Sequence, residues 1–265
     1  MCQDQAISYL NAIGYNPISL PREGFDPLMI LAGPNDQLRY LGGLADLVGT
    51  GGTLPEPRRD DRAGNVSDRR SGKVEAGVGF DLVGKLLAAF GGTGAKASAG
   101  YDGSGSIEIV FQDVLHDYVA PLQVGAFLAR SEPLEGSIAA MLQPYVNVYL
   151  VTDTLKSNAF GVAAYTKDGL AVNAKADAIG NQVGANAKLQ VTNEADNVIS
   201  YQGDRWLRFA FRALPLVFQG GQRLRLGLDQ SLLVAKAAPS SPGGQLPIDA
   251  YELLGPDRLV DIDFG

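Results

Sequence analysis

Strict alternation of apolar and polar residues marks four segments of the chain. A period of two is typical of β-strands with one apolar and one polar face. A Gly/Asn-containing turn at residues 179–184 joins the last two segments and predicts a hairpin. The apolar positions, segment by segment, are Val74, Ala76, Val78 and Phe80; Ala95, Ala97, Ala99 and Tyr101; Val172, Ala174, Ala176 and Ala178; and Ala185, Ala187, Leu189 and Val191.

Other patterns predict the elements between these segments. Apolar residues at helical spacing predict helices over residues 4–13, 82–90, 121–130 and 134–142. Further apolar runs predict strands over residues 25–31, 107–111, 145–152, 160–166, 205–213 and 224–228. The polar, Pro/Arg/Asp-rich residues 50–71 predict a long loop. The fold class expected is α+β, with a twisted central antiparallel β-sheet and surrounding short helices.

The composition changes near the C-terminus. Residues 236–247 (KAAPSSPGGQLP) are rich in Pro and Gly and predict an exposed linker. The tail beyond it carries a net charge of −4, from Asp249, Glu252, Asp257, Asp261 and Asp263 against Arg258. Large apolar side chains in the same tail predict that it docks on the body of the protein: Tyr251, Leu253, Leu254, Leu259, Val260, Ile262 and Phe264.

Composition and charge exclude several classes of protein. Of 265 residues, 46% are hydrophobic and 19% charged, which excludes a disordered chain. The net charge of −7 argues against a nucleic-acid partner, because phosphate binding needs a basic surface. A single Cys and a single His cannot form a Cys/His metal site or an internal disulfide. The N-terminus has no signal-peptide pattern and no apolar run reaches about 18 residues, so a soluble cytoplasmic protein is expected.

Two enzymatic interpretations are weak. Cys2 and His116 form a nucleophile–base pair only if the second residue of the chain is held rigidly, so His116 is more simply a surface or turn residue. The stretch from Gly79 to Lys85 nearly matches a phosphate-binding loop, but Leu86 stands where that loop has Ser or Thr. A strand-to-helix turn is the simpler interpretation, and no enzymatic activity is expected.

The long polar stretch contains a basic cluster with two interpretations. One is a solvated loop balanced by Asp60, Asp61 and Asp68. The other is attraction to anionic lipid headgroups, to which each basic residue adds about 1 kcal/mol. The cluster consists of Arg58, Arg59, Arg62, Arg69, Arg70 and Lys73.

The alternating segments also have two interpretations. The simpler one is a sheet with one face on the core. Their Ala-rich apolar faces and length of roughly 8–10 residues also suit strands that rest lightly on a soluble body and later cross a bilayer.

The order of several short motifs resembles that of the gasdermin family, and the size resembles its short bacterial members. Residues 14–20 (GYNPISL) and 25–31 (FDPLMIL) are similar to the family's N-terminal pattern, with small departures at Asn16 and Ile18. Residues 74–78 and 96–101, ending in 106–109, resemble the first membrane hairpin of the family. The resemblance covers roughly residues 1–230.

The resemblance implies three regions and a mechanism. These are a pore-forming domain (1–235), a protease-sensitive linker (236–249) and an autoinhibitory peptide (250–265). A caspase-like or trypsin-like protease would cut within the linker, where candidate positions are Lys236, Ala237, Leu246 and Asp249. The monomer would then oligomerise into a transmembrane β-barrel pore in the inner membrane and kill the cell, as anti-phage defence. It also implies S-palmitoylation of Cys2 as the one prosthetic group.

Two competing hypotheses remain. A soluble module that binds an acyl chain or hydrophobic ligand under its strands would carry a stoichiometric ligand and leave membranes intact. A nucleotide enzyme built on residues 79–85 would bind ATP or GTP.

Overall fold

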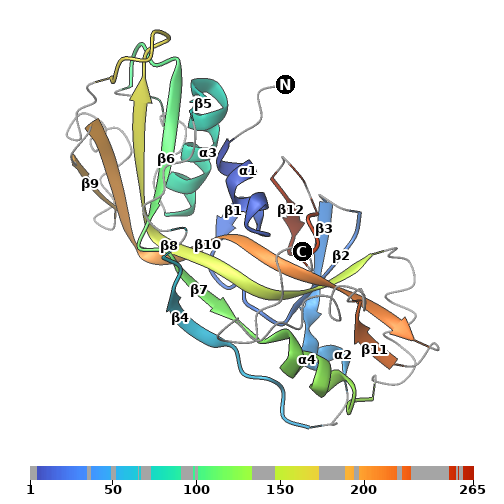
Figure 1. Cartoon of the computed structure of the whole chain (residues 1–265). Coiled ribbons are helices and arrows are strands. Elements are labelled where there is room, and N and C mark those ends of the chain that lie inside the picture. Colours follow the sequence, from blue (N-terminus) through green and yellow to red (C-terminus); the bar gives the residue numbers. More distant parts are fainter. Residues whose placement is uncertain are drawn as a thin grey trace, which may run out of the picture.

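The computed structural model describes residues 5–34, 37–48, 52–64, 66, 73–90, 98, 101–132, 147–172, 189–193, 197–219, 223–227, 251–254, 256 and 259–265. These residues form a mixed α+β fold, dominated by a large twisted sheet with a few short helices (Figure 1). The helices are α1 (Gln5–Ala12), α2 (Leu44–Leu47), α3 (Ala76–Ala89) and α4 (Pro121–Leu128). The strands are β1 (Asn16–Arg22), β2 (Met29–Ala32), β3 (Gln37–Gly43), β4 (Arg58–Arg62), β5 (Val74–Glu75), β6 (Ser106–Gln112), β7 (Leu115–Tyr118), β8 (Val148–Tyr165), β9 (Leu189–Asn193), β10 (Val198–Gln219), β11 (Arg223–Leu226) and β12 (Asp261–Asp263).

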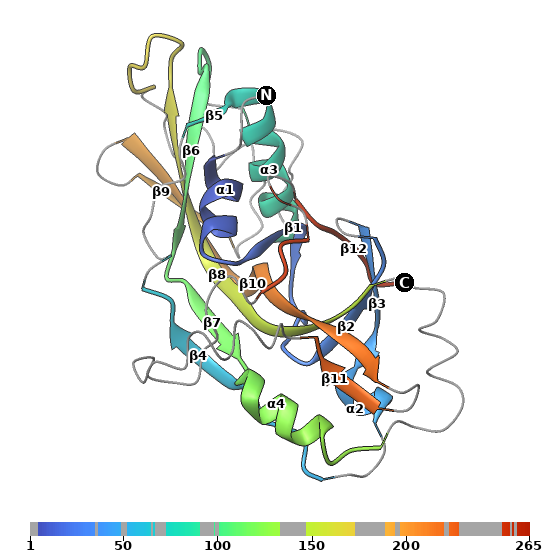
Figure 2. The same cartoon turned by 45° about the vertical axis from the view of Figure 1, so that its right-hand side comes forward.

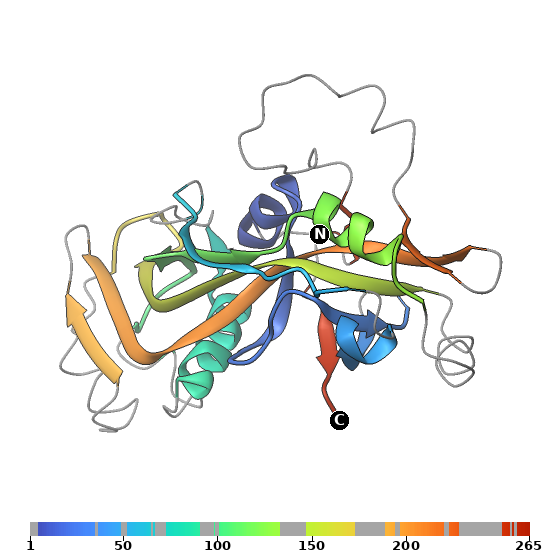
Figure 3. The same ribbon diagram turned by 90° about the horizontal axis from the view of Figure 1, so that it is seen from below.

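Two long antiparallel strands, β8 and β10, form the axis of the sheet (Figures 1 and 3). β8 has 18 residues and β10 has 22. Their register shifts between Gln202 and Leu207, and such a β-bulge bends the strands that contain it. β8 pairs with β6 on one side of this bend and with β7 on the other. The bend therefore separates two arms of the sheet.

The upper arm is the one in which β6 pairs with β8, and the lower arm is the one in which β7 and β2 pair with β8. The lower arm closes into a ring through the C-terminal tail. Its strands follow the order β1-β10-β8-β2-β3-β12, with β12 parallel to β3. A parallel bridge between Ile18 of β1 and Val260, which precedes β12, joins the two ends of this order. Figure 2 shows the resulting ring of strands, with the tail between β1 and β3.

Helices cover both sides of the long strands (Figure 3). α3 packs Val83, Leu86, Leu87 and Phe90 onto β6, β8 and β10 in the upper arm. α4 contributes to a second core with β2 and β11, whereas α1 packs on the opposite side of β10 from α3. Among the residues described, none of the helices combines the length and apolar character needed to cross a bilayer.

The predicted strand over residues 74–80 is wrong beyond its first two residues. Ala76 and Val78 lie in α3, which begins directly after β5. The buried positions Gly79, Val83, Leu86, Leu87 and Phe90 follow the helical period, so the longer amphipathic pattern prevails over the short alternation. Because Gly79 to Lys85 lie inside this helix, no phosphate-binding loop forms there.

Other predicted elements are corrected at their boundaries. The stretch 50–71 contains an edge strand, β4, and the strand predicted from Phe25 begins only at Met29. The two strands predicted over 145–152 and 160–166 belong to one continuous strand, β8, and the polar stretch between them includes Lys156, which forms a buried ion pair with Asp117. The strand predicted over 205–213 is likewise only the middle of β10.

His116 is also placed differently from the prediction. It lies in β7 with its side chain 14% exposed and stacks on Tyr118, with ring centroids 4.8 Å apart. It is therefore a partly buried strand residue and not a surface or turn residue.

Several predicted elements lie outside the described residues. These are most of the second alternating segment (residues 95–97, 99 and 100), the helix over 134–142, and the hairpin region 173–188.

Gly203 on β10 provides a test of how α3 packs at the bend. A Cβ atom at this position would lie 2.4 Å from Cδ1 of Phe90, whose ring is buried. We expect Gly203→Ala to lower the free energy of unfolding by about 1–3 kcal/mol, since the ring has to move out of a packed core. Chemical denaturation measures the loss.

Gly77→Ala in α3 is the matched control, because its Cβ would meet no atom within 4 Å. It should leave stability unchanged or slightly raised. Equal losses in both variants would contradict this packing.

Candidate functional site

Main-chain hydrogen bonds fix the C-terminal tail between two strands. The Val260 amide donates to the Pro17 carbonyl over 2.8 Å, and the Ser19 amide donates to the Val260 carbonyl over 2.9 Å. On its other side, β12 pairs in parallel with β3, placing Ile262 opposite Leu38. The tail thus satisfies polar groups on two strand edges that would otherwise be unpaired.

Apolar tail residues fill the centre of the ring. Val260 is fully buried, Leu254 is 1% exposed and Tyr251 7%. Ile262 and Phe264 pack on the same core, which also contains Ile18, Phe25, Leu31, Leu38, Tyr149, Val151, Phe211 and Ala213. The structure places these tail side chains against the body of the protein. Leu253 differs from these residues, because its side chain is 38% exposed.

Asn16 at the start of β1 binds the tail backbone through its side chain. Its carboxamide donates to the carbonyl of Glu252 over 2.9 Å and accepts from the amide of Leu254 over 2.7 Å. The residue itself is fully buried. In the sequence, Asn16 stands out only as a departure from the family motif. Nothing in its sequence neighbourhood indicates that its side chain binds a segment more than 230 residues away.

Phe264 near the chain end occupies an aromatic and cationic pocket. Its ring packs edge-to-face on Phe25, with centroids 5.9 Å apart, and lies 5.7 Å from the ring of Tyr40. The Arg22 guanidinium sits 3.7 Å above the Phe264 ring. Asp263 adds an exposed ion pair with Arg39, and Asp261 contacts the hydroxyl of Ser19.

Arg212 links the tail to the interior of the sheet. Its guanidinium lies 4.1 Å from the ring centre of Tyr15 and 4.8 Å from that of Tyr251. It donates to the Ile13 carbonyl over 2.6 Å and lies 3.8 Å from an Asp153 oxygen, which also accepts from the Tyr15 hydroxyl. Burial, together with the charge of Asp153, raises the pKa of Tyr15 well above its ordinary value.

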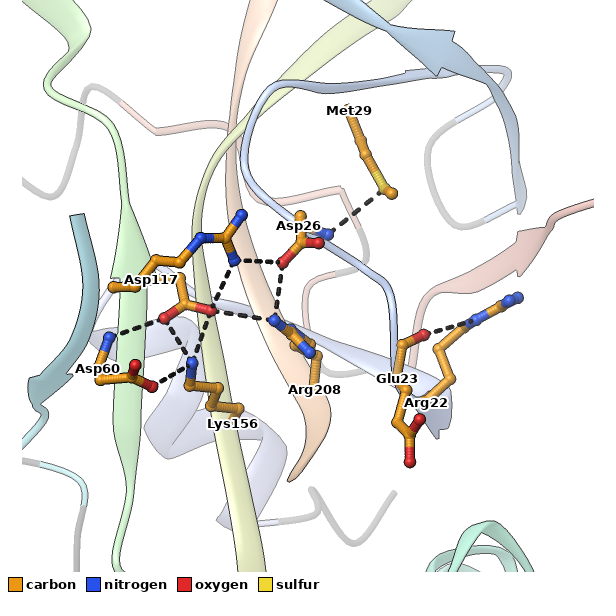
Figure 4. A network of polar contacts seen from close by, with 9 residues as sticks. Arg22, Glu23, Asp26, Met29, Asp60, Asp117, Lys156 and Arg208 are labelled. Carbon is orange, nitrogen blue, oxygen red and sulfur yellow. Dashed lines mark hydrogen bonds and ion pairs between the residues drawn. The ribbon is translucent and has the colours of Figure 1, made fainter. Parts of the chain in front are cut away.

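A balanced ionic network lies where the sheet bends (Figure 4). At its centre, the Asp117 side chain is completely buried and accepts from Lys156 Nζ at 2.6 and 2.8 Å and from the Asp60 amide at 2.9 Å. Arg208 bridges Asp117 and Asp26, at 3.0 and 2.7 Å. Arg59 also contacts Asp26, at 3.1 Å. The network ties β4, β7, β8 and β10 to the loop between β1 and β2.

Comparisons with known proteins give the family. The model of the Bacterial Gasdermin Family matches residues 18–224. The chain belongs to the bacterial gasdermin family. The Gasdermin bGSDM of Vitiosangium sp. (strain GDMCC 1.1324) is 31% identical over 268 residues, covering 99% of this chain and 98% of that protein. The Gasdermin bGSDM of a Desulfuromonadales bacterium is also 31% identical, covering 94% and 96%.

A solved structure supports the fold. The structure of a bacterial gasdermin from Bradyrhizobium tropiciagri aligns with a TM-score of 0.65 over 99% of this chain and 97% of that chain, at 18% identity. The resemblance to the gasdermin family inferred from the short motifs is confirmed, as is the α+β fold class. Gasdermins are pore-forming proteins and not enzymes.

The residues of the predicted basic cluster have different surroundings in the structure of this gasdermin. Arg59 takes part in the ionic network, although its side chain is 49% exposed. Arg58 and Arg62 lie exposed on β4, and the Lys73 ammonium lies 4.1 Å from the ring centre of Tyr165. Arg69 and Arg70 lie outside the described residues.

Only some of the remaining predicted site residues of this gasdermin lie in the described part of the chain. Val172 and Val191 pack on the core beneath α3, and Leu189 begins β9. Outside the described residues lie Cys2, Ala95, Ala97, Ala99, Ala174, Ala176, Ala187, Lys236, Ala237, Leu246 and Asp249. Ala76 and Val78 are helical, as described above.

The buried carboxylate of Asp117 leads to a prediction about stability. Asp117→Asn removes the fully buried carboxylate that Lys156 and Arg208 share and leaves them only the more exposed Asp60 and Asp26, so at pH 7 we expect a loss of about 3–5 kcal/mol in the free energy of unfolding. Asp168→Asn, in an exposed turn, is the control and should lose less than about 0.5 kcal/mol.

The same variant predicts a pH dependence. Burial on its own raises the pKa of Asp117, but hydrogen bonds from Lys156 and the Asp60 amide and the charge of Arg208 lower it below its ordinary value of 3.8. The contribution of this carboxylate is therefore complete above pH 3.8 and is lost as the pH falls through the lower pKa of the folded state. Urea unfolding between pH 7 and about pH 2 should show the gap between wild type and Asp117→Asn narrowing at the acid end. A constant gap would contradict the assignment.

Proposed function

We propose that this gasdermin is an autoinhibited pore-former that becomes active when a protease cuts between its body and its C-terminal tail. The observation that carries the proposal is the position of the tail as the closing strand of the ring. The body (1–235) is the pore-forming part, residues 236–249 are the protease-sensitive linker, and residues 250–265 are the inhibitory peptide. A caspase-like or trypsin-like protease is the activating partner.

Removal of the tail has two physical consequences that favour assembly. It leaves β1 and β3 with unpaired backbone groups, and open strand edges pair readily with other chains. It also uncovers the apolar core that Leu254 and Val260 now close. The protein is thus a stable monomer while the tail is bound. Without the tail, contact with neighbouring copies and with lipid would stabilise it, because such contact covers the open edges and the apolar core.

The change in charge and a covalent lipid would both favour binding to the membrane. Loss of the tail removes a net charge of −4, which favours approach to anionic lipid through basic residues such as Arg58, Arg62 and Lys73. A palmitoyl group on Cys2 would give marginal membrane affinity on its own and so would prime insertion.

The alternating segments supply the membrane strands in this proposal. They would leave the body and pair around a closed transmembrane β-barrel, since only closed pairing satisfies all backbone groups in lipid. The residues 76–78 would then change from helix to strand. The protein would be cytoplasmic while inhibited and would enter the inner membrane after cleavage, killing the cell as anti-phage defence.

The proposal is tested by dye release from anionic vesicles. The recognition sequence of a specific protease is placed within residues 237–249, and the full chain is compared with the cut chain. We expect release only after cutting, because the tail then leaves the ring. A variant with a scrambled recognition sequence, treated with the same protease, should stay silent.

The outcomes separate the hypotheses. Release from the uncut chain would contradict autoinhibition. Silence from both forms, with Cys2 acylated as judged by intact mass, would contradict pore formation and favour the ligand-binding module.

The aromatic pocket around Phe264 gives a second prediction. Phe264→Ala removes ring contacts with Phe25 and Tyr40 and the cation–π contact with Arg22, interactions of about 0.5–1.5 kcal/mol each. We expect faster dye release after cutting, because the peptide dissociates more readily.

Leu253→Ala is the control from the same peptide, since that side chain is exposed. Its release rate should equal that of the parent. If the two variants behave alike, Phe264 does not hold the tail.

A further inference from the structure

The bend of β8 and β10 borders a polar cavity that the proposed tail mechanism does not use. It has a volume of about 440 Å³, within the range of roughly 300–1,000 Å³ typical of small-molecule sites. The end of β4, the turn from β6 to β7 and the bulge of β8 and β10 meet around it (Figure 1). The side chains and backbone that matter here belong to Arg62, Gly64, Asp113, Asn158, Gln202 and Trp206.

The bulge places an unsatisfied acceptor at this cavity. Ladder pairing stops between Gln202–Ala159 and Leu207–Ser157, so Asn158 falls in the gap. Its Oδ1 atom is buried and accepts no hydrogen bond from the described residues. An unmet buried acceptor costs about 1–3 kcal/mol, and the Asn158 side chain that carries it also lines the cavity.

Two opposite charges line the cavity without meeting. Arg62 and Asp113 both border it, yet neither forms an ion pair with any residue in the described part of the chain. Asp113 holds a left-handed backbone conformation, with φ of 49°, which fixes it at the tight turn before β7. Arg62 can bind a phosphate through its planar fork of donors, whereas Asp113 repels a simple anion and attracts an ammonium group.

Trp206 adds an aromatic surface suited to the same cation. An indole ring is the strongest of the aromatic side chains in cation–π contacts with ammonium groups. Trp206 is also the single Trp of the chain, so its fluorescence reports on this cavity alone.

We propose that this cavity binds a zwitterion of the phosphoethanolamine type, with the phosphate at Arg62 and the ammonium group between Asp113 and Trp206. The amides of Asn158 and Gln202 complete the polar lining. The ligand is either the headgroup of an ethanolamine phospholipid or a soluble phosphoethanolamine compound. The inference that the ligand is a lipid headgroup rests on the proposed function at membranes. The inference that the cavity binds such a zwitterion does not.

The test uses the intact, uncut chain and the emission of Trp206. Glycerophosphoethanolamine is titrated against glycerophosphoglycerol, which has the phosphate without the amine. We expect a saturable change with the first compound and at least tenfold weaker binding of the second, because only the first satisfies Asp113. Calorimetry provides a readout that does not depend on the indole.

Three variants test the geometry. Asp113→Asn keeps a residue type that tolerates the left-handed conformation, and Arg62→Gln keeps a long polar chain; each should weaken binding about tenfold or more. Gly64→Phe fills the cavity without removing a polar group, since a Cβ atom there meets nothing within 4 Å, and should abolish binding. Arg225→Gln and Asp168→Asn are controls that remove the same charges elsewhere and should bind as the parent does.

Vesicles separate the two sources of the ligand. A shift of Trp206 emission with mixed phosphatidylethanolamine–phosphatidylglycerol vesicles, absent with phosphatidylglycerol alone and lost in Asp113→Asn, assigns the site to lipid. A response to the soluble compound alone assigns it to a free ligand.

Two results would overturn the proposal: no saturation with glycerophosphoethanolamine up to about 10 mM by either readout, or binding that Asp113→Asn leaves unchanged in a variant whose circular dichroism matches the parent. Dye release after cutting is independent of these titrations. Failure of this site therefore leaves the pore-forming proposal intact, and the reverse also holds.

Discussion

The structure depends on the strand that the C-terminal tail contributes. Val260 and β12 lie between β1 and β3 and close the ring that runs through β10, β8 and β2. A sheet edge with unpaired amides and carbonyls is a template for association, and proteins that remain monomeric cover such edges. Here the cover is a segment at the end of the chain, joined to the body through residues 228–250. A single backbone cut is therefore enough to turn an internal strand into a separate peptide.

The ionic network at the bend is coupled to this ring through neighbouring residues. Asp26 accepts from Arg208 and Arg59, and the next residue toward the N-terminus, Phe25, packs on Phe211 and on Phe264 of the tail. Arg212 forms a parallel link, since it lies against both Tyr15 and Tyr251. Buried ion pairs contribute little net stability but are costly to break, so they favour one arrangement of the strands over others. The tail thus docks on a surface whose shape is fixed from inside the sheet.

Much of this organisation could be predicted from the sequence, and the exceptions have physical causes. The apolar pattern of the tail, above all Val260 and Leu254, predicted docking because such side chains do not stay in water. The alternation at Ala76 and Val78 led to a wrong prediction of a strand. The longer helical pattern from Gly79 to Phe90 determines the local structure instead. Asn16 and Asp117 were not recognised, since each acts through partners that are distant in sequence: Asn16 through residues 252 and 254, and Asp117 through Lys156 and Arg208. Polar residues give a periodic signal only when they line a solvent face, and these two are buried.

The most direct test of the central claim is amide hydrogen exchange before and after the tail is cut and removed. The account predicts faster exchange in residues 17–20 and 37–39, the segments that pair with Val260 and β12, while the centre of the β8–β10 ladder keeps its protection. Unchanged protection in both edge segments after the peptide has left would show that the tail does not hold the ring closed, and would contradict the account.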